Sequence, residues 1–92
     1  MANEQPTAED IRSAVKKLVA EITERESDEI SDTALFTEEL GIDSLMAIEM
    51  MVAVDKRYKI EIPEEEFGKI KNVNDAVELV QRLLAQAAAK GR

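Results

Sequence analysis

The sequence contains no cysteine and no histidine in its 92 residues. Without cysteine the chain can form neither a disulfide bond nor a thiolate metal site. Without histidine it lacks the commonest general base and the commonest zinc ligand, so a Ser-His-Asp triad is excluded. Any chemistry that needs a thiol or an imidazole must therefore come from outside this chain.

Aromatic residues and long apolar runs are also scarce, and the 20 acidic side chains outnumber the 12 basic ones. Aromatic content of 3% provides no stacking platform for nucleic acid. A net charge of −8 repels phosphate backbones and anionic lipid heads, and it attracts basic protein partners. No apolar run approaches the length of a membrane span, and residues 1–10 lack the apolar middle of a signal peptide. We therefore expect a cytoplasmic, monomeric protein that neither inserts into membranes nor binds nucleic acid.

Helical periodicity dominates the rest of the sequence. Thr7 with Asp10, and Asn72 with Asp75, have the spacing of capping pairs before two amphipathic segments. A third helix is predicted from Ser44 to about residue 58, and a short fourth helix follows Pro63. The predicted buried positions are Ile11, Val15, Leu18, Val19 and Ile22, then Leu45, Ile48, Met51 and Val52, then Val73, Ala76, Val77, Val80, Leu83 and Leu84. This pattern predicts an all-α four-helix bundle of three longer helices and one short helix.

A long acidic loop is predicted between the first two helices. Residues 24–43 hold eight acids and one base, Arg25, which leaves a net charge of −7. An EF-hand beginning at Asp28 is excluded because Thr33 stands where the sharp turn needs glycine, and we predict no metal site. The helical domain is expected to span residues 8–85, with a disordered N-terminus over 1–7 and a frayed Ala-rich tail over 86–92.

Ser44 is the residue whose position most directly indicates a function. It follows Asp43 at a predicted helix N-terminus, where unpaired N–H groups favour a phosphodiester. On these two residues alone, the commoner explanation is a simple helix cap. A Ser-Lys pair with Lys56 or Lys59 has no support in the spacing, so we expect that the chain is not an enzyme.

The segment Leu40-Gly41-Ile42-Asp43-Ser44-Leu45 resembles the modification motif of acyl and peptidyl carrier proteins. Glu49, Ile62-Pro63 and the order of helices also match, and the resemblance covers about residues 8–85. It implies that a phosphopantetheinyl transferase attaches 4′-phosphopantetheine from coenzyme A to Ser44, which Asp43 and Leu45 flank. The thiol of that arm would carry acyl groups as thioesters to enzymes of fatty-acid, lipid or polyketide synthesis.

The resemblance also implies an acyl-chain cavity and a docking surface. The expected cavity residues are Leu45, Ile48, Met51, Val52, Ile62, Phe67 and Val77. Acyl-transferring and acyl-processing enzymes grip the acidic second helix of typical fatty-acid-synthase carriers with Lys and Arg. Here the expected contacts are Met46, Glu49, Lys56 and Arg57, on a helix whose two acids and two bases cancel. This departure predicts specialised partners.

Two alternatives stay open at this point. One is a peptidyl, aryl or D-alanyl carrier that an adenylating ligase loads. The other is a helical interaction module that is never modified, in which Ser44 only caps a helix.

Overall fold

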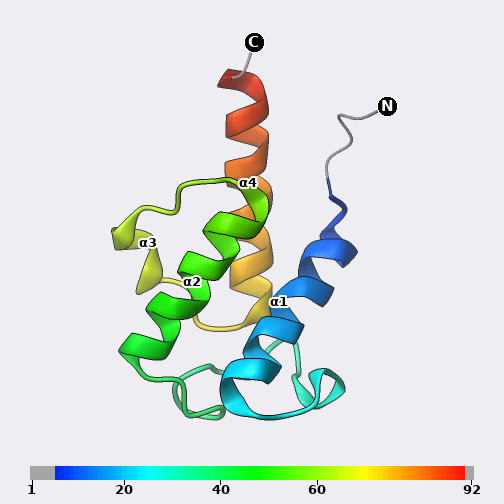
Figure 1. Ribbon diagram of the computed structural model, residues 1–92, viewed down its shortest axis with the longest axis vertical. Coiled ribbons are helices and arrows are strands. Elements are labelled where there is room, and N and C mark those ends of the chain that lie inside the picture. Colours follow the sequence, from blue (N-terminus) through cyan, green and yellow to red (C-terminus); the bar gives the residue numbers. More distant parts are fainter. Residues whose placement is uncertain (1–5, 91–92) are drawn as a thin grey trace.

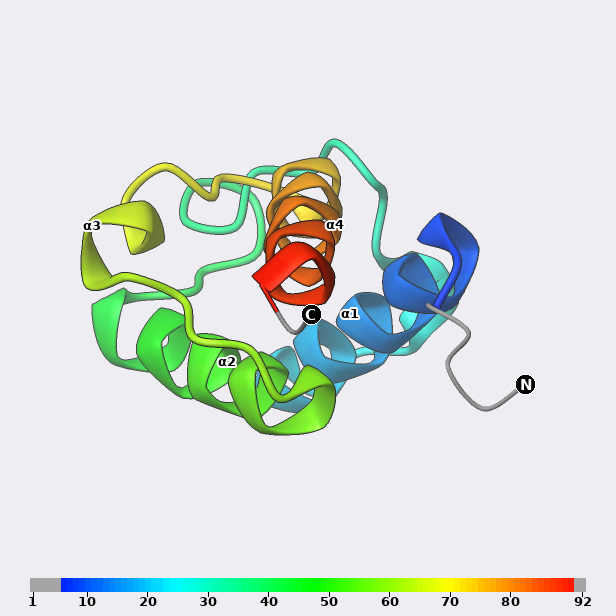
Figure 2. The ribbon, with the colours of Figure 1, turned by 90° about the horizontal axis from the view of Figure 1, so that it is seen from above.

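The computed structural model describes residues 6–90, with side chains through Ala88, and this part of the chain contains helices and no strands. The elements in order are α1 (Ala8–Thr23), the 3₁₀ turn η1 (Ser27–Glu29), α2 (Ser44–Tyr58), α3 (Glu64–Phe67) and α4 (Val73–Lys90). The predicted all-α bundle of three longer helices and one short helix is confirmed. The helix α1 packs against α4 and α2, and α3 lies against α2 (Figures 1 and 2).

Capping side chains fix where the first and last helices begin. The Thr7 hydroxyl accepts a hydrogen bond from the Asp10 N–H at 3.1 Å, and the Asp10 carboxylate accepts one from the Thr7 N–H at 3.2 Å. At the start of α4, Asn72 Oδ1 accepts from the Asp75 N–H at 2.9 Å. Both predicted capping pairs are confirmed, because each satisfies N–H groups that have no partner within the helix.

A single apolar core lies between α1, α2, α4 and the long loop. The helix α2 contributes Met50, Met51 and Val54 to this core, each at most 2% exposed. The prediction that Leu45, Ile48 and Val52 face inward is wrong, since their exposed fractions are 64%, 44% and 42%. Their physical setting explains the error. Apolar residues lie around most of α2, so helical periodicity is compatible with more than one buried face. Packing against α1 buries the face that holds Met50, Met51 and Val54, and leaves Leu45, Ile48 and Val52 exposed.

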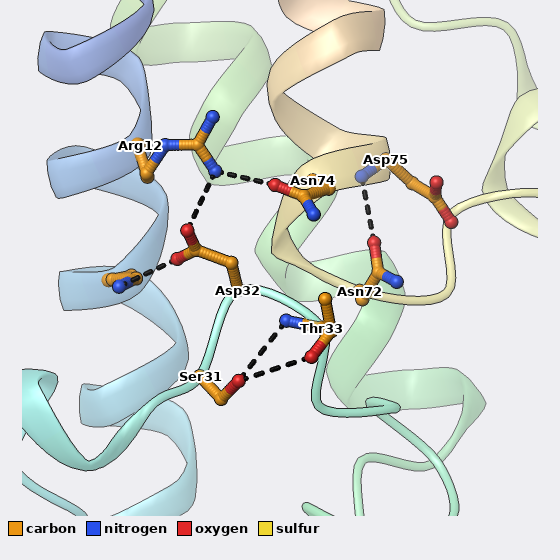
Figure 3. A network of polar contacts seen from close by, with 8 residues as sticks. Arg12, Ser31, Asp32, Thr33, Asn72, Asn74 and Asp75 are labelled. Atoms are coloured by element: carbon orange, nitrogen blue, oxygen red, sulfur yellow. Dashed lines mark hydrogen bonds and ion pairs between the residues drawn. The ribbon is translucent and has the colours of Figure 1, made fainter.

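Buried apolar side chains and polar contacts hold the long acidic loop. The apolar anchors, all less than 10% exposed, are Ile30, Ala34, Phe36, Leu40 and Ile42. Asp32 Oδ2 lies 3.2 Å from the Arg12 guanidinium, and Arg12 donates a 2.6 Å hydrogen bond to Asn74 (Figure 3). The Lys16 ammonium lies 2.7 Å from Asp32 Oδ1. The Asn74 N–H also donates to the Asp32 carbonyl at 3.2 Å, so the loop is held to both α1 and α4.

The C-terminal end differs from the expected frayed tail. The helix α4 continues through residues 86–90 and rises above the rest of the bundle (Figure 1). The side chains from Gln86 to Ala88 are exposed, so the high helix propensity of alanine accounts for helix without burial. Residues 1–5 of the predicted disordered N-terminus, and residues 91–92 of the predicted tail, lie outside the described residues. The domain boundaries at 8 and 85 stay a prediction.

Candidate functional site

Asp43, and not Ser44, caps α2. Asp43 Oδ1 accepts a hydrogen bond from the Met46 N–H at 2.9 Å, and the Asp43 carbonyl accepts one from the Ala47 N–H at 2.9 Å. Ser44 is the first helical residue and is exposed. Among the described residues its hydroxyl makes no hydrogen bond. The N–H groups of Ser44 and Leu45 also have no protein partner in this part of the chain, so the positive end of α2 can accept an anion beside the hydroxyl.

The backbone before Ser44 is held in place at two points. Gly41 has φ 71°, a left-handed conformation that favours glycine. Ile42 is 2% exposed, and its N–H donates to the Phe36 carbonyl at 2.9 Å. A buried anchor two residues before Ser44 therefore presents the hydroxyl from a fixed position, although Ser44 itself stands in solvent.

A hollow of about 670 Å³ opens beside Ser44, between the loop, the start of α2 and α3. Asp43 and Ser44 belong to its lining. Its apolar lining is shared by three segments and includes Phe36, Ile42, Ala47, Ile48, Phe67 and Ile70. Glu38 and Lys71 also line it, so the hollow is apolar with charged groups of both signs along its border.

The hollow matches only part of the predicted cavity. Of the seven residues named from the sequence, Ile48 and Phe67 line it. Met51, Ile62 and Val77 are buried in the core, while Leu45 and Val52 are exposed on the far side of α2. The sequence analysis missed the contributions of the loop and of the segment between α3 and α4, because periodicity reports the face of a helix and not how a loop folds. The only sequence signal for these residues was that Phe36 and Ile70 are apolar residues in the connections between helices.

The predicted partner-contact residues lie on different sides of α2. Glu49 and Lys56 are exposed on the same outer face as Leu45 and Val52, because residues four, seven and eleven positions apart share one face of a helix. Met46 is half-buried and packs against the core. Arg57 is exposed next to α1, with its guanidinium carbon 5.7 Å from the centre of the Tyr58 ring.

Asp55 connects the end of α2 to the segment that leads to α3. Its Oδ1 accepts a hydrogen bond from the Ile62 N–H at 3.1 Å, and the carboxyl group is half-buried. Burial raises the pKa of Asp55, the Ile62 N–H opposes this by stabilising the carboxylate, and nearby Glu61 adds a smaller upward contribution. Asp55 therefore joins the end of α2 to the segment that leads to α3.

Within residues 6–90, no group of three or more acidic side chains is placed so that it could hold a metal ion, and no helix is long and apolar enough to cross a membrane. Ser44 itself offers an accessible hydroxyl, next to an anion-accepting helix end and an apolar hollow.

Comparisons with known proteins match most of the chain. Residues 13–80, which include Ser44, match the family model described as a phosphopantetheine attachment site. The chain is 36% identical over 73 residues to an acyl carrier protein of Rickettsia bellii, across 79% of this chain and 85% of that protein. It is also similar to the solved structure of an acyl carrier protein from Enterococcus faecalis, described for its high thermal stability. That likeness has a TM-score of 0.73 and 25% identity, and it covers 84% of this chain and 98% of the other.

Proposed function

Because the chain belongs to the acyl carrier protein family, we propose that Ser44 is the residue to which its 4′-phosphopantetheine is attached. A member of this family is a carrier and not an enzyme, and it holds acyl groups on phosphopantetheine. The observation that carries the proposal is that Asp43 caps α2 and leaves the adjacent Ser44 hydroxyl exposed and free. A transferase can reach this hydroxyl without unfolding any part of the helix.

The residues around Ser44 suit the phosphodiester that would form there. The free N–H groups at the start of α2 offset negative charge at the hydroxyl. The attached group supplies the thiol for thioester formation, which this cysteine-free chain does not have. Asp43 and Leu45 flank the attachment residue, and Asp43 supports it by keeping the helix start ordered.

We further propose that the hollow beside Ser44 receives part of the acyl chain. Its apolar lining, which includes Phe36, Ile42 and Phe67, can cover methylene groups that would otherwise contact water. The carried acyl groups would then go to enzymes of fatty-acid, lipid or polyketide synthesis. A cytoplasmic location and a monomeric state belong to the same proposal.

The test is enzymatic modification followed by mass measurement. The apo protein is incubated with coenzyme A, Mg²⁺ and a broad-range phosphopantetheinyl transferase, and the intact mass is recorded. We expect one phosphopantetheinyl group per chain, none on the Ser44→Ala variant, and normal modification of Ser13→Ala, which removes an exposed serine from α1. Modification of Ser44→Ala, or failure of the natural chain to gain mass, would contradict the proposal.

The phosphopantetheinylated protein also distinguishes the acyl-carrier function from that of a peptidyl, aryl or D-alanyl carrier. Malonyl and longer acyl groups should be accepted on the arm from acyl-transferring enzymes. Loading only by an adenylating ligase with an amino or aryl acid would move the assignment to the second class.

A further inference from the structure

Lys71 is the single base among the residues that line the hollow beside Ser44. It is exposed in the connection between α3 and α4. Two acids, Glu38 and Asp43, line the same hollow, so the two acids and one base there sum to −1. The ion pairs found among residues 6–88 do not include the Lys71 ammonium. The hollow therefore has one cation that has no counter-charge within ion-pair distance in this part of the chain.

The main chain holds Lys71 at the border of the hollow. Its N–H donates a hydrogen bond to Asp75 Oδ2 at 2.9 Å, and its carbonyl accepts one from the Phe36 N–H at 2.8 Å. The first bond joins Lys71 to the start of α4, and the second joins it to the loop that leads to Ser44. The flexible four-carbon stem can move the ammonium while the backbone stays in place. Lys71 is thus anchored at its backbone and free at its charged end.

A phosphodiester on the Ser44 hydroxyl would add one negative charge beside two carboxylates. The charged groups of the lining would then sum to −2, and Lys71 would be the only cation among them. The hollow has room for part of the arm, since its volume of about 670 Å³ lies within the roughly 300–1,000 Å³ of small-molecule pockets. A lysine ammonium binds phosphate oxygens as a compact point charge, through charge-assisted hydrogen bonds.

Given the attachment at Ser44 proposed above, we propose that Lys71 forms an ion pair with the phosphodiester of the arm. Ser44 and Lys71 line the same hollow from segments far apart in the sequence, so the pair bridges the hollow. It holds the first part of the arm against the protein and beside the apolar lining of Phe36 and Phe67. Lys71 is a positioning residue, because it acts on where the arm lies and takes no part in making or breaking the thioester.

Partial acetylation of lysine amines tests this ion pair. The apo protein and the phosphopantetheinylated protein, its thiol blocked with iodoacetamide, are treated with limiting acetic anhydride, and acetylation of each lysine is read from peptide masses. At about 0.01 M salt the arm should slow acetylation of Lys71 roughly twofold to fivefold, as expected for one exposed ion pair. The slowing should disappear near about 1 M salt, where the Debye length falls to about 3 Å.

Lys69 is the matched control within the same molecule. It is an exposed lysine in the same connection, but it does not line the hollow. Its acetylation rate should change by less than about 1.5-fold when the arm is attached, because exposed charges that are not in contact interact weakly.

The ³¹P NMR signal of the attached phosphodiester gives a second readout. It should shift in Lys71→Gln relative to the natural chain, return toward its natural position in Lys71→Arg, which keeps the charge, and stay in place in Lys69→Gln. The substitutions of Lys71 keep the main-chain bonds to Asp75 and Phe36, so these variants should fold normally.

Intact mass distinguishes failure of the ion pair from failure of the attachment. A natural chain that gains no phosphopantetheinyl group overturns the attachment itself. When the arm is present, equal slowing at Lys71 and Lys69 overturns the ion pair, because the added charge alone would then explain the change. Slowing that persists near about 1 M salt also overturns it, because the arm would then only cover the lysine. A ³¹P signal that does not respond to Lys71→Gln has the same meaning.

Discussion

At the scale of single residues, two aspartates show how the same side chain responds to opposite surroundings. Asp32 bonds to Lys16 and faces Arg12, which together lower its pKa below the ordinary 3.8, against a smaller upward effect of burial. Burial raises the pKa of Asp55 above the same ordinary value. The two carboxyl groups should therefore make opposite contributions to the pH dependence of stability.

Asp32→Asn should destabilise the protein at neutral pH. The variant weakens two ion pairs that join the loop to α1, and such partly exposed pairs are worth about 0.5–1.5 kcal/mol together. Because the pKa of Asp32 is lowered on folding, this stability is complete above the unfolded pKa and is lost as pH falls through the folded pKa. Thermal unfolding should show a deficit at pH 7 that begins to shrink near about pH 4 and closes as the pH falls through the lowered pKa of Asp32. Glu38→Gln removes one loop charge without breaking an ion pair found in the described residues, so an equal deficit there would contradict this explanation.

Asp55→Asn should do the reverse and stabilise the protein at neutral pH. Asparagine keeps an oxygen that can accept from the Ile62 N–H, and it removes a half-buried charge close to the C-terminal end of α2, where anions are unfavourable. Because the pKa of Asp55 is raised on folding, its contribution is most favourable below the unfolded pKa and is lost as pH rises through the folded pKa. The gain in melting temperature should therefore appear at pH 7 and vanish at about pH 3, where Asp55 is protonated in both the folded and the unfolded state. A loss of stability at pH 7 would mean that the hydrogen bond from the Ile62 N–H to the carboxylate stabilises the protein more than burial of its charge destabilises it.

At the scale of elements, the start of α2 separates the capping residue, Asp43, from the proposed attachment residue, Ser44. Asp43→Ala should lower the free energy of unfolding by about 0.5–2 kcal/mol, the usual cost of losing an N-cap. Ser44→Ala should change it by less, because its hydroxyl makes no hydrogen bond in the described part of the chain. Urea unfolding of the two apo variants checks this ranking. A larger loss for Ser44→Ala would reassign the cap.

The helices also show what the sequence could and could not predict. Where polar residues occupy one side, as in α1 and α4, periodicity and capping pairs predicted the element and its buried face. In α2 the apolar residues occupy two sides, so the sequence predicted the helix and placed Leu45 and Val52 on the wrong face. The position of Ser44 followed from a local motif. The hollow did not, because its lining joins Phe36 and Ile70 through the fold of two loops, which no local pattern encodes.

At the scale of the whole molecule, the acidic loop concentrates negative charge that only part of the fold offsets. Asp32 has ion-pair partners on α1, whereas Glu38, Asp28 and several other loop acids are exposed. Their mutual repulsion reaches about 30 Å at 0.01 M salt and much less at higher concentration. The stability of the folded protein should therefore depend on ionic strength.

Raising the salt concentration from about 0.01 M to about 0.2 M should raise the melting temperature by a few degrees. Millimolar Mg²⁺ should act in the same direction by screening. The double variant Asp28→Asn with Glu38→Gln should melt higher than the natural chain at low salt and respond less to added salt. Melting curves that do not change with salt would show that the fold already compensates these carboxylates.

The separation of Asp43 from Ser44 has a consequence for the lifetime of the protein. With the phosphopantetheine on Ser44 as proposed, neither its addition nor its removal would break a hydrogen bond that holds the start of α2, because Asp43 makes that bond. The apo, phosphopantetheinylated and acylated forms should then be equally resistant to proteolysis. The prosthetic group can thus be renewed on a schedule of its own, independent of the synthesis and degradation of the chain that bears it.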